Sequence, residues 1–511
     1  MERVRRLLLC LVAASALVLS GCTSSPAPSP TDPPTSSPTA SAVRLTTART
    51  TVAADAPTAL ERAVEASRAL FDAAPGVVLA PAGDGAAQTQ ASAAAARLHV
   101  PMLLTATGAA SPTAAASSAA PSTPVVTPTP DATAAEVRRL GASWSVDFGG
   151  AHVAGLRSRP ASTAPQVPGR ASAVVVATSP SADTAALATA AAARAQVVHS
   201  GSADLNGDAA VVRALAAAKD DRAVLVGSAF AERQDLDWSV AAARTGWTYA
   251  DGTQRAWDGK NLHIALYGTP SDGVLGVLGQ QSEPATIARV RSLVSQYRPL
   301  TSRTVSPMLE VIATVASGGP TDNGDYSSEI APSKLEPYID AALAQHVPVI
   351  LDLQPGRSDF LTQAKEYASL LEKPGVGLAL DPEWRLGPKQ KPLVQIGRVS
   401  AAEVNATSAW LADLVKEKDL PPKPFVLHEF RLTMLQQRQD IVVDRPELDT
   451  LIHVDGQGSQ PDKQATWRAV RAGAPKVGWG WKNFLKKDHP VLTPKQTIEQ
   501  VHPTPDLITY Q

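Results

Sequence analysis

Short apolar runs alternate with amphipathic segments throughout the second half of the chain. Continuous apolar runs are typical of parallel strands that helices cover on both faces. Eight strands, each followed by a helix, over about 250 residues indicate a (β/α)8 barrel. An open doubly wound sheet is the alternative, but the strand count and the absence of a Gly-rich first turn favour a TIM-like barrel over residues 258–511. The predicted strands are 263–267, 309–315, 348–353, 376–380, 424–427, 450–454, 476–479 and 507–510, with helices at 284–296, 335–345, 360–371, 401–418 and 463–472.

The first half also alternates strand and helix patterns, but it is richer in Ala, Val, Ser and Thr. Apolar strands that alternate with Ala-rich helices indicate an α/β layered fold with parallel pairing. We expect this separate domain to cover residues 58–257. Its predicted strands are 76–80, 100–105, 124–126, 173–177, 196–198 and 223–227, with helices at 59–73, 86–98, 183–194 and 209–219.

The extreme N-terminus has the pattern of an export signal. Three arginines within the first six residues precede an apolar run at 7–19, which is too short to be a membrane span. The run ends in Leu19-Ser20-Gly21-Cys22, which resembles a bacterial lipobox. That resemblance implies that residues 1–21 are removed and that Cys22 becomes a lipid-bearing N-terminus. The protein is then expected on the outer face of the bacterial cytoplasmic membrane.

Composition extends this picture to the next segment. Residues 22–57 are mostly Ser, Thr, Pro and Ala, a composition that buries too little apolar surface to fold and predicts a disordered tether. The only other cysteine, Cys10, leaves with the signal, so no disulfide is expected. A formal net charge of −1 gives no indication of nucleic-acid binding.

The first half weakly resembles the cell wall-binding repeat 2 family. The resemblance lies in an Ala-rich helix that leads into a Val/Leu strand, and it has a partial second copy at 211–227 that lacks the family's paired glycines. It implies binding to a cell-wall polymer rather than chemistry. The matching stretches are residues 62–67, 77–80 and 94–105.

Polar residues cluster where the barrel strands end, which is the end at which barrels of this kind carry their chemistry. Three strands end in polar residues two positions apart, and residues two apart on a strand share a face. The alternative is a set of polar side chains that bond one another and buried water. The pairs are Asp352 with Gln354, Asp381 with Glu383 and His453 with Asp455, and His428 ends an intervening strand.

Neighbouring carboxylates favour acid–base chemistry, because burial and repulsion separate their pKa values. Glycoside hydrolysis needs such a pair, one carboxyl to protonate the leaving oxygen and one to stabilise or attack the sugar. We therefore expect Asp352 to orient the acid or stabilise charge, Asp455 to be the reserve nucleophile or base, and Gln354, His428 and His453 to bind substrate. Aromatic residues at strand ends would stack on sugar rings: Trp384, Trp479, Trp481 and Tyr267.

The fourth strand resembles that of the chitinase-like glycoside hydrolases. Residues 377–384 end in Asp, any residue, Glu and an aromatic residue, as in that family's motif. The resemblance implies that Glu383 is the proton donor and that Asp381 supports it and a substrate acetamido group. The chain departs from the family at Ala379, where the family has another acidic residue, and the match covers one strand of eight.

A metal site is a weaker alternative. Asp352, His428, His453 and Asp455 are suitable ligand types, but the first strand lacks the His-x-His pair of many barrel metallohydrolases. We expect no metal and no cofactor. Glu310, close to the start of its predicted strand, is expected to face the opposite, stabilising end of the barrel.

These observations predict a lipid-anchored, two-domain envelope protein. Its barrel is expected to bind an envelope polysaccharide or peptidoglycan and is a candidate to hydrolyse it. The first alternative is a non-catalytic protein that grips wall polymer with both domains. The second is an assembly factor whose partner is another protein.

Overall fold

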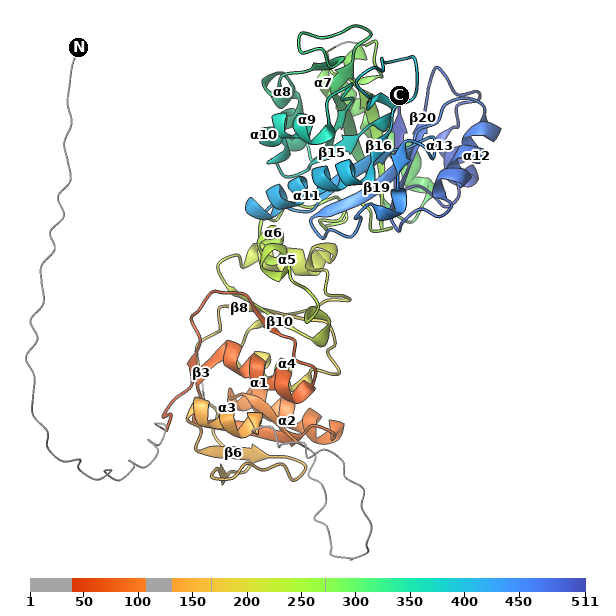
Figure 1. The fold of residues 1–511 in the computed structure, drawn as a ribbon. Coiled ribbons are helices and arrows are strands. Elements are labelled where there is room, and N and C mark those ends of the chain that lie inside the picture. Colours follow the sequence, from red (N-terminus) through yellow and green to blue (C-terminus); the bar gives the residue numbers. More distant parts are fainter. Residues whose placement is uncertain (1–38, 107–130, 167, 272) are drawn as a thin grey trace, which may run out of the picture. The chain divides into compact units, whose positions relative to one another are not determined.

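The computed structural model describes residues 39–106, 131–166, 168–271 and 273–511. Eight parallel strands close into a barrel in the second half, which confirms the predicted TIM-like fold (Figure 1). The first strand pairs in parallel with both the second and the last, so the sheet has no open edge. The strands are β11 (Asn261–Gly268), β12 (Thr304–Ala316), β14 (Val349–Leu353), β15 (Val376–Leu380), β17 (Lys423–His428), β19 (Leu448–Val454), β20 (Gly478–Asn483) and β21 (Leu507–Tyr510).

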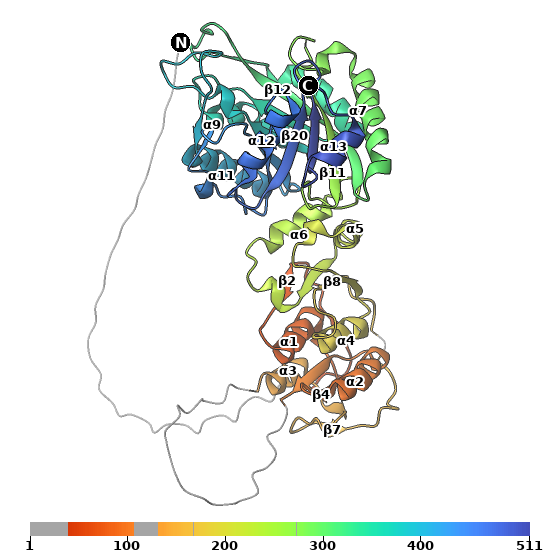
Figure 2. The ribbon, with the colours of Figure 1, turned by 90° about the vertical axis from the view of Figure 1, so that its right-hand side faces the viewer.

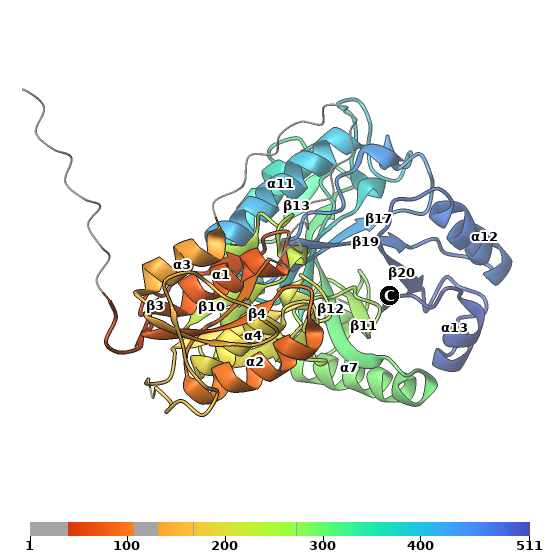
Figure 3. The same cartoon turned by 90° about the horizontal axis from the view of Figure 1, so that it is seen from below.

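Helices surround this barrel, as Figure 3 shows for α7, α11, α12 and α13. Their inner faces pack with the outward-facing strand residues in one large apolar core. The connection from β17 to β19 holds only β18 (Leu435–Gln436) and a 3-10 turn, so one βα unit has no α-helix. The helices are α7 (Glu283–Tyr297), α8 (Pro332–Ala344), α9 (Phe360–Glu366), α10 (Ala368–Leu371), α11 (Ala401–Glu417), α12 (Gln460–Arg471) and α13 (Pro494–Gln500).

The barrel interior is built in two layers. The lower layer is apolar, and all but one of the strands supply a side chain to it; β20 instead has glycines at this level. Two positions further along each strand, the side chains are polar, because residues two apart share a face. The lower layer is Ala265, Met308, Ile350, Ala379, Val426, Leu451 and Leu507. The upper layer is Tyr267, Glu310, Asp352, Asp381, His428, His453, Lys482 and Thr509, all of them buried.

The first half contains two four-stranded parallel sheets, which confirms its α/β class. One sheet has the order β5-β4-β6-β7 and the other β2-β10-β8-β9. Helices α1 and α4 pack against each other and share one apolar core with strands of both sheets (Figure 2). The strands are β2 (Val52–Ala54), β4 (Gly76–Pro81), β5 (Met102–Thr105), β6 (Trp144–Asp147), β7 (Arg157–Ser158), β8 (Ala173–Ala177), β9 (Gln196–His199) and β10 (Arg222–Val226).

Local capping explains why the helices of this half begin where they do. Thr58 and Glu61 form a capping box at α1, and the Asp84 and Asp131 side chains accept backbone N–H groups at the starts of α2 and α3. Short strands β1 (Arg44–Leu45) and β3 (Phe71–Ala73) pair antiparallel beside α1. The helices are α1 (Ala59–Leu70), α2 (Gly85–Leu98), α3 (Ala132–Leu140), α4 (Thr184–Ala192), α5 (Ala209–Ala217) and α6 (Leu236–Arg244).

The expectation of a disordered tether up to residue 57 is wrong for its last part. Val52–Ala54 form β2, an edge strand that pairs in parallel with β10, and Ala54 is buried. Backbone pairing to an existing sheet therefore orders residues whose own composition would not fold. The signal, Cys22, the start of the tether and the predicted strand at 124–126 lie outside the described residues.

No helix of the described residues combines the length and the apolar character needed to cross a bilayer.

Candidate active site

A cavity of about 740 Å³ opens at the carboxyl ends of the barrel strands, above the polar layer. Six of the predicted site residues line it, and Lys482, Phe430 and Phe484 are among the lining residues that the sequence analysis did not single out. A volume of this order is typical of pockets that bind small molecules. The six are Tyr267, Gln354, Asp381, Glu383, Trp384 and Asp455.

Glu383 is the partly exposed carboxyl of the cavity wall. Strand β15 ends at Leu380, and Pro382–Trp384 form a 3-10 turn that Asp381 caps by accepting the Glu383 N–H at 3.1 Å. The spacing predicts that the two acids share a strand face, and this is wrong because Glu383 lies in the turn after β15. Both acids nevertheless line the cavity. Burial and the charge of Asp455 raise the pKa of Glu383 to about 7, although Lys482 and His428 oppose this rise.

Asp455 follows β19 and bonds directly to His428. The His428 Nδ1–H donates to Asp455 Oδ2 at 2.8 Å, and Lys482 Nζ lies 3.9 Å from the same oxygen. Burial alone would raise the pKa of Asp455, but His428 and Lys482 lower it below its usual value. Asp455 is thus a carboxylate at neutral pH.

Asp381 is a more deeply buried acid. Burial raises its pKa well above the usual range; His428 opposes this rise, and the charges of Asp352 and Asp455 add to it. A neutral carboxyl can donate a hydrogen bond, which a carboxylate cannot. Asp381 is therefore suited to hold a substrate hydroxyl or carbonyl oxygen in the cavity.

Asp352 lies in the polar layer and does not line the cavity. Tyr267 donates its hydroxyl to Asp352 Oδ2 at 2.7 Å, and Gln354 Nε2 donates to the Tyr267 oxygen at 3.3 Å. Burial raises the pKa of Asp352 to about 6, and the Glu310 charge contributes. Gln354 also accepts the Ala316 N–H, so its amide holds the cavity wall together rather than standing free for a ligand.

The expectation that Glu310 faces the stabilising end of the barrel is wrong. Strand β12 starts at Thr304, so Glu310 lies in mid-strand and points into the polar layer. The apolar pattern hid this start because Pro307 interrupts the run, and proline usually marks the edge or end of a strand. Glu310 Oε1 accepts the His428 Nε2–H at 2.8 Å, and Thr509 donates to Oε2 at 3.3 Å.

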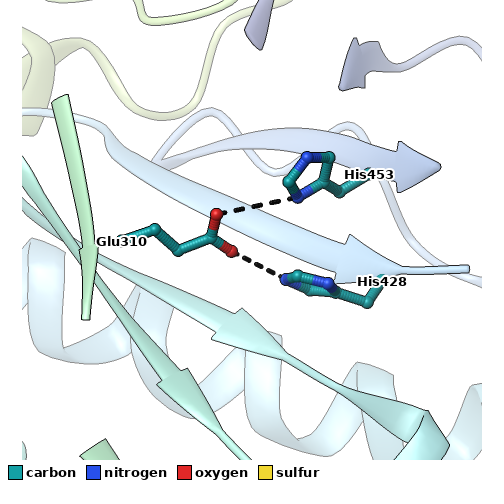
Figure 4. A group of neighbouring side chains, drawn as sticks. All are labelled: Glu310, His428 and His453. Carbon is teal, nitrogen blue, oxygen red and sulfur yellow. Dashed lines mark hydrogen bonds and ion pairs between the residues drawn. The ribbon is translucent and has the colours of Figure 1, made fainter. Parts of the chain in front are cut away.

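His428 and His453 converge on Glu310 from the adjacent strands β17 and β19 (Figure 4). Burial would lower the pKa of His428, but Asp455 and Glu310 hold it well above its usual value, so the ring is an imidazolium. Burial lowers the pKa of His453, which is therefore neutral at pH 7. Burial would raise the pKa of Glu310, but the two histidines bring it well below the usual range.

Two of the predicted stacking residues do not reach the cavity. Trp481 and Trp479 alternate with the inward-facing Gly480 and Lys482 on β20, and their rings lie 5.7 and 6.0 Å from Trp467 of α12. The prediction that they bind sugar is wrong, because the pleat of β20 turns both rings toward the helix layer. Lys482, one residue further, is the inward-facing side chain, and its Nζ lies 3.4 Å from the Tyr267 ring centroid.

The structure also explains why the chain departs from the chitinase-like motif in β15. Ala379, where that family has another acid, packs in the apolar lower layer. A carboxylate at this depth would be desolvated without a partner, so Ala379 fits this barrel as it is built.

Comparison with known proteins adds little. No protein-family model matches the chain, and no curated protein matches its sequence. Two solved structures, both titled xylanase-alpha-amylase inhibitor proteins and one of them in complex with trehalose, are each 14% identical to this chain with a TM-score of 0.30. They cover 49% of this chain and 92% and 93% of their own. At this TM-score the likeness is no basis for assigning a function.

Proposed function

We propose that the barrel hydrolyses glycosidic bonds in a polysaccharide of the cell envelope, with Glu383 as the general acid. The observation that carries this proposal is the pairing of two unlike carboxyls in one cavity. Glu383 has a pKa of about 7 and keeps its proton at mildly acidic pH, while Asp455 is held as a carboxylate by its 2.8 Å bond to His428. Two carboxyls whose environments separate their pKa values can share acid and base roles.

The chemistry follows from these two states. Glu383 would give its proton to the glycosidic oxygen as the bond to the anomeric carbon breaks. The Asp455 carboxylate would stabilise the positive charge on the sugar, either by attacking the anomeric carbon or by activating a water. Asp381, with its raised pKa, would donate a hydrogen bond to the substrate and fix the backbone of Glu383.

The rest of the cavity supports a saccharide as the substrate. Trp384, Phe430 and Phe484 give the wall apolar faces that suit the C–H faces of sugar rings, and Lys482 and Arg431 supply hydrogen-bond donors. A pocket that mixes aromatic faces with a few polar groups suits a ligand with apolar and hydroxyl-bearing sides.

The envelope as the location is supported by the N-terminal sequence alone. The lipobox-like Leu19-Ser20-Gly21-Cys22 supports a lipid anchor on the outer face of the membrane. The resemblance of the first half to cell wall-binding repeats supports a second site that binds wall polymer. An anchored barrel of this kind would act on peptidoglycan or on a surface polysaccharide within reach of its tether.

The test is turnover by a chain that lacks its first 38 residues, so that every described strand is kept. Purified protein should release new reducing ends from at least one wall or exopolysaccharide preparation, and Glu383→Gln should slow the release at least about a hundredfold. The exposed Glu417→Gln serves as the matched control, because its side chain is 73% exposed and lies on α11. Binding without release by the unmodified protein, with the same affinity in Glu383→Gln, would instead establish the non-catalytic alternative.

A further inference from the structure

Below the cavity lies a group of three side chains, of which the proposed hydrolysis uses only His428, as the partner of Asp455. Glu310, His428 and His453 each turn one ligand-type atom toward the others, and these atoms lie within 4.8 Å of one another (Figure 4). All three residues are fully buried. Two imidazoles and a carboxylate on one point are a ligand set typical of transition-metal sites in proteins.

His453 is the member of the group that lacks a hydrogen-bond partner in the described part of the chain. It has no exposed surface, and among the described residues neither of its ring nitrogens has a hydrogen-bond partner. Its Nδ1 lies 3.7 Å from Glu310 Oε2, too far for a hydrogen bond. An ion bonded to two atoms at about 2 Å holds them roughly 3–4 Å apart, so this gap fits a bridging cation. Buried polar groups rarely stay unpaired, because the lost hydration costs about 1–3 kcal/mol.

The residues around the group are those that metal-binding histidines usually have. His428 Nδ1–H donates to Asp455 at 2.8 Å, the carboxylate–histidine pairing that orients a metal ligand. Thr509 donates to Glu310 Oε2 at 3.3 Å and fixes that carboxylate. Asp352 Oδ1 has no hydrogen-bond partner among the described residues and lies 3.9 Å from His428 Nε2, within reach as a further oxygen ligand.

Gly480 provides the room for the His453 ring. A Cβ at this position of β20 would lie 2.6 Å from His453 Cδ2, closer than any packed contact. Strand β20 therefore has no side chain at Gly480, where the His453 ring packs against it.

We propose that Glu310, His428 and His453 bind one divalent transition-metal ion in the polar layer of the barrel. The ion would take the place of the proton that His428 shares with Glu310, and it would give His453 the partner it lacks. Imidazole ligands favour Zn²⁺, Fe²⁺, Ni²⁺ or Cu²⁺ over Mg²⁺ and Ca²⁺, which prefer oxygen. None of the three ligands is a proposed catalytic carboxyl, although His428 also bonds to Asp455, so the metal site goes beyond the proposed hydrolysis.

The test is direct metal binding to the chain that lacks residues 1–38. After chelation and dialysis, isothermal titration with Zn²⁺ and then with Mg²⁺ should give one Zn²⁺ site and no Mg²⁺ site. Titration with Co²⁺ should produce the visible absorption of a nitrogen- and oxygen-bound ion. Glu310→Gln and His453→Asn should each weaken Zn²⁺ binding at least about a hundredfold.

His263→Asn is the matched control, because His263 is equally buried in the barrel but its ring nitrogens have partners in Ala256 and Ser306. It should bind Zn²⁺ like the unmodified protein. The proposal fails if the unmodified chain binds no Zn²⁺, or if His453→Asn binds it as tightly as the control. If the two ligand variants do not fold, anomalous scattering from a Zn²⁺-soaked crystal decides whether the ion sits between these three side chains.

A further variant separates this proposal from the proposed function. Glu383→Gln keeps every proposed ligand and should keep full Zn²⁺ binding while it loses glycan hydrolysis. Metal binding without any turnover would therefore reject the hydrolase and keep the metal site, and turnover without metal binding would do the reverse.

Discussion

At the scale of single residues, the distinctive feature of this barrel is the number of ionisable groups in one layer. Glu310, Asp352, His428 and Lys482 are all buried there, and each balances part of the charge of another. Isolated buried charges would be costly, but a connected set of acids and bases can stay ionised. This layer fixes the charge beneath the cavity that Glu383 and Asp455 line.

Glu383→Gln should lower kcat on a glycan substrate by at least about a hundredfold, because general acid catalysis contributes roughly 10²- to 10⁴-fold. Stability should change little, since the side chain is partly exposed. Kinetics and thermal melts of the variant and of Glu417→Gln test this. An unchanged kcat would remove Glu383 from the chemistry.

The pH dependence of kcat should follow the titration of Glu383. The acid acts in its protonated form, and its pKa is about 7, so kcat should hold below pH 7 and fall about tenfold per unit above it. Residual activity in Glu383→Gln should lack this limb. An alkaline limb that persists in the variant would assign the titration to another group.

Trp384 and Trp481 should respond differently to substitution. Trp384 lines the cavity and is partly exposed, so Trp384→Ala should raise KM about tenfold, the equivalent of about 1.4 kcal/mol, with little loss of stability. Trp481 is buried against Trp467, so Trp481→Ala should cost about 3–5 kcal/mol of folding free energy. Chemical denaturation and Michaelis kinetics separate the two effects, and an equal stability loss in both would contradict the assignment.

At the scale of elements, β20 shows how one strand serves both sides of the barrel wall. Its glycines and Lys482 face inward, and its two tryptophans face α12. Gly480→Ala should destabilise the fold by about 1–3 kcal/mol, because the added methyl group would meet the His453 ring. Gly319→Ala is the control, since a Cβ there meets nothing within 4 Å. Equal melting temperatures for the two variants would show that the ring moves freely.

Strand β2 shows that a segment of low complexity can still be structural. It adds an edge to the sheet by parallel pairing with β10, and it lies between the tether and α1. A chain that lacks 57 residues loses both β1 and β2 and should be less stable than one that lacks 38 by on the order of 3 kcal/mol, from the lost strand hydrogen bonds and burial. Urea denaturation of both truncated chains measures this difference, and identical midpoints would make both edge strands dispensable.

At the scale of the whole molecule, the proposed anchor determines which substrates the barrel can reach. Cys22→Ala in the full-length chain should move the protein from the membrane fraction to the soluble fraction without changing turnover per molecule, because the barrel folds far along the sequence from Cys22. Fractionation with immunodetection, and a mass shift on the N-terminal peptide of the unmodified protein, test this. A Cys22→Ala protein that remains in the membrane fraction would rule out the lipid as its anchor.

Much of the fold could be predicted from the sequence because a buried strand is visible locally as a continuous run of apolar residues. The strand at residues 376–380 was predicted with the bounds that β15 has, since its apolar run is unbroken and ends in Asp-Pro. The predicted strand at β12 begins five residues late, because Thr, Ser and Pro at the start of β12 weaken the apolar pattern. A strand that is held by its neighbours tolerates such residues, and that support is not visible locally.

The sequence by itself determined the fold class and the order of the eight barrel strands, and it put Asp381, Glu383 and Asp455 just after strand ends, because strand periodicity and strand ends are local properties. Only the tertiary structure decided that Glu310 meets His428 and His453, that Lys482 faces inward, and that Trp479 and Trp481 face α12. These outcomes depend on barrel closure and on the register between strands far apart in the chain. Closure of the barrel decides which side chains lie in the same layer of its interior. The charged side chains of the polar layer lie together beneath the cavity for this reason.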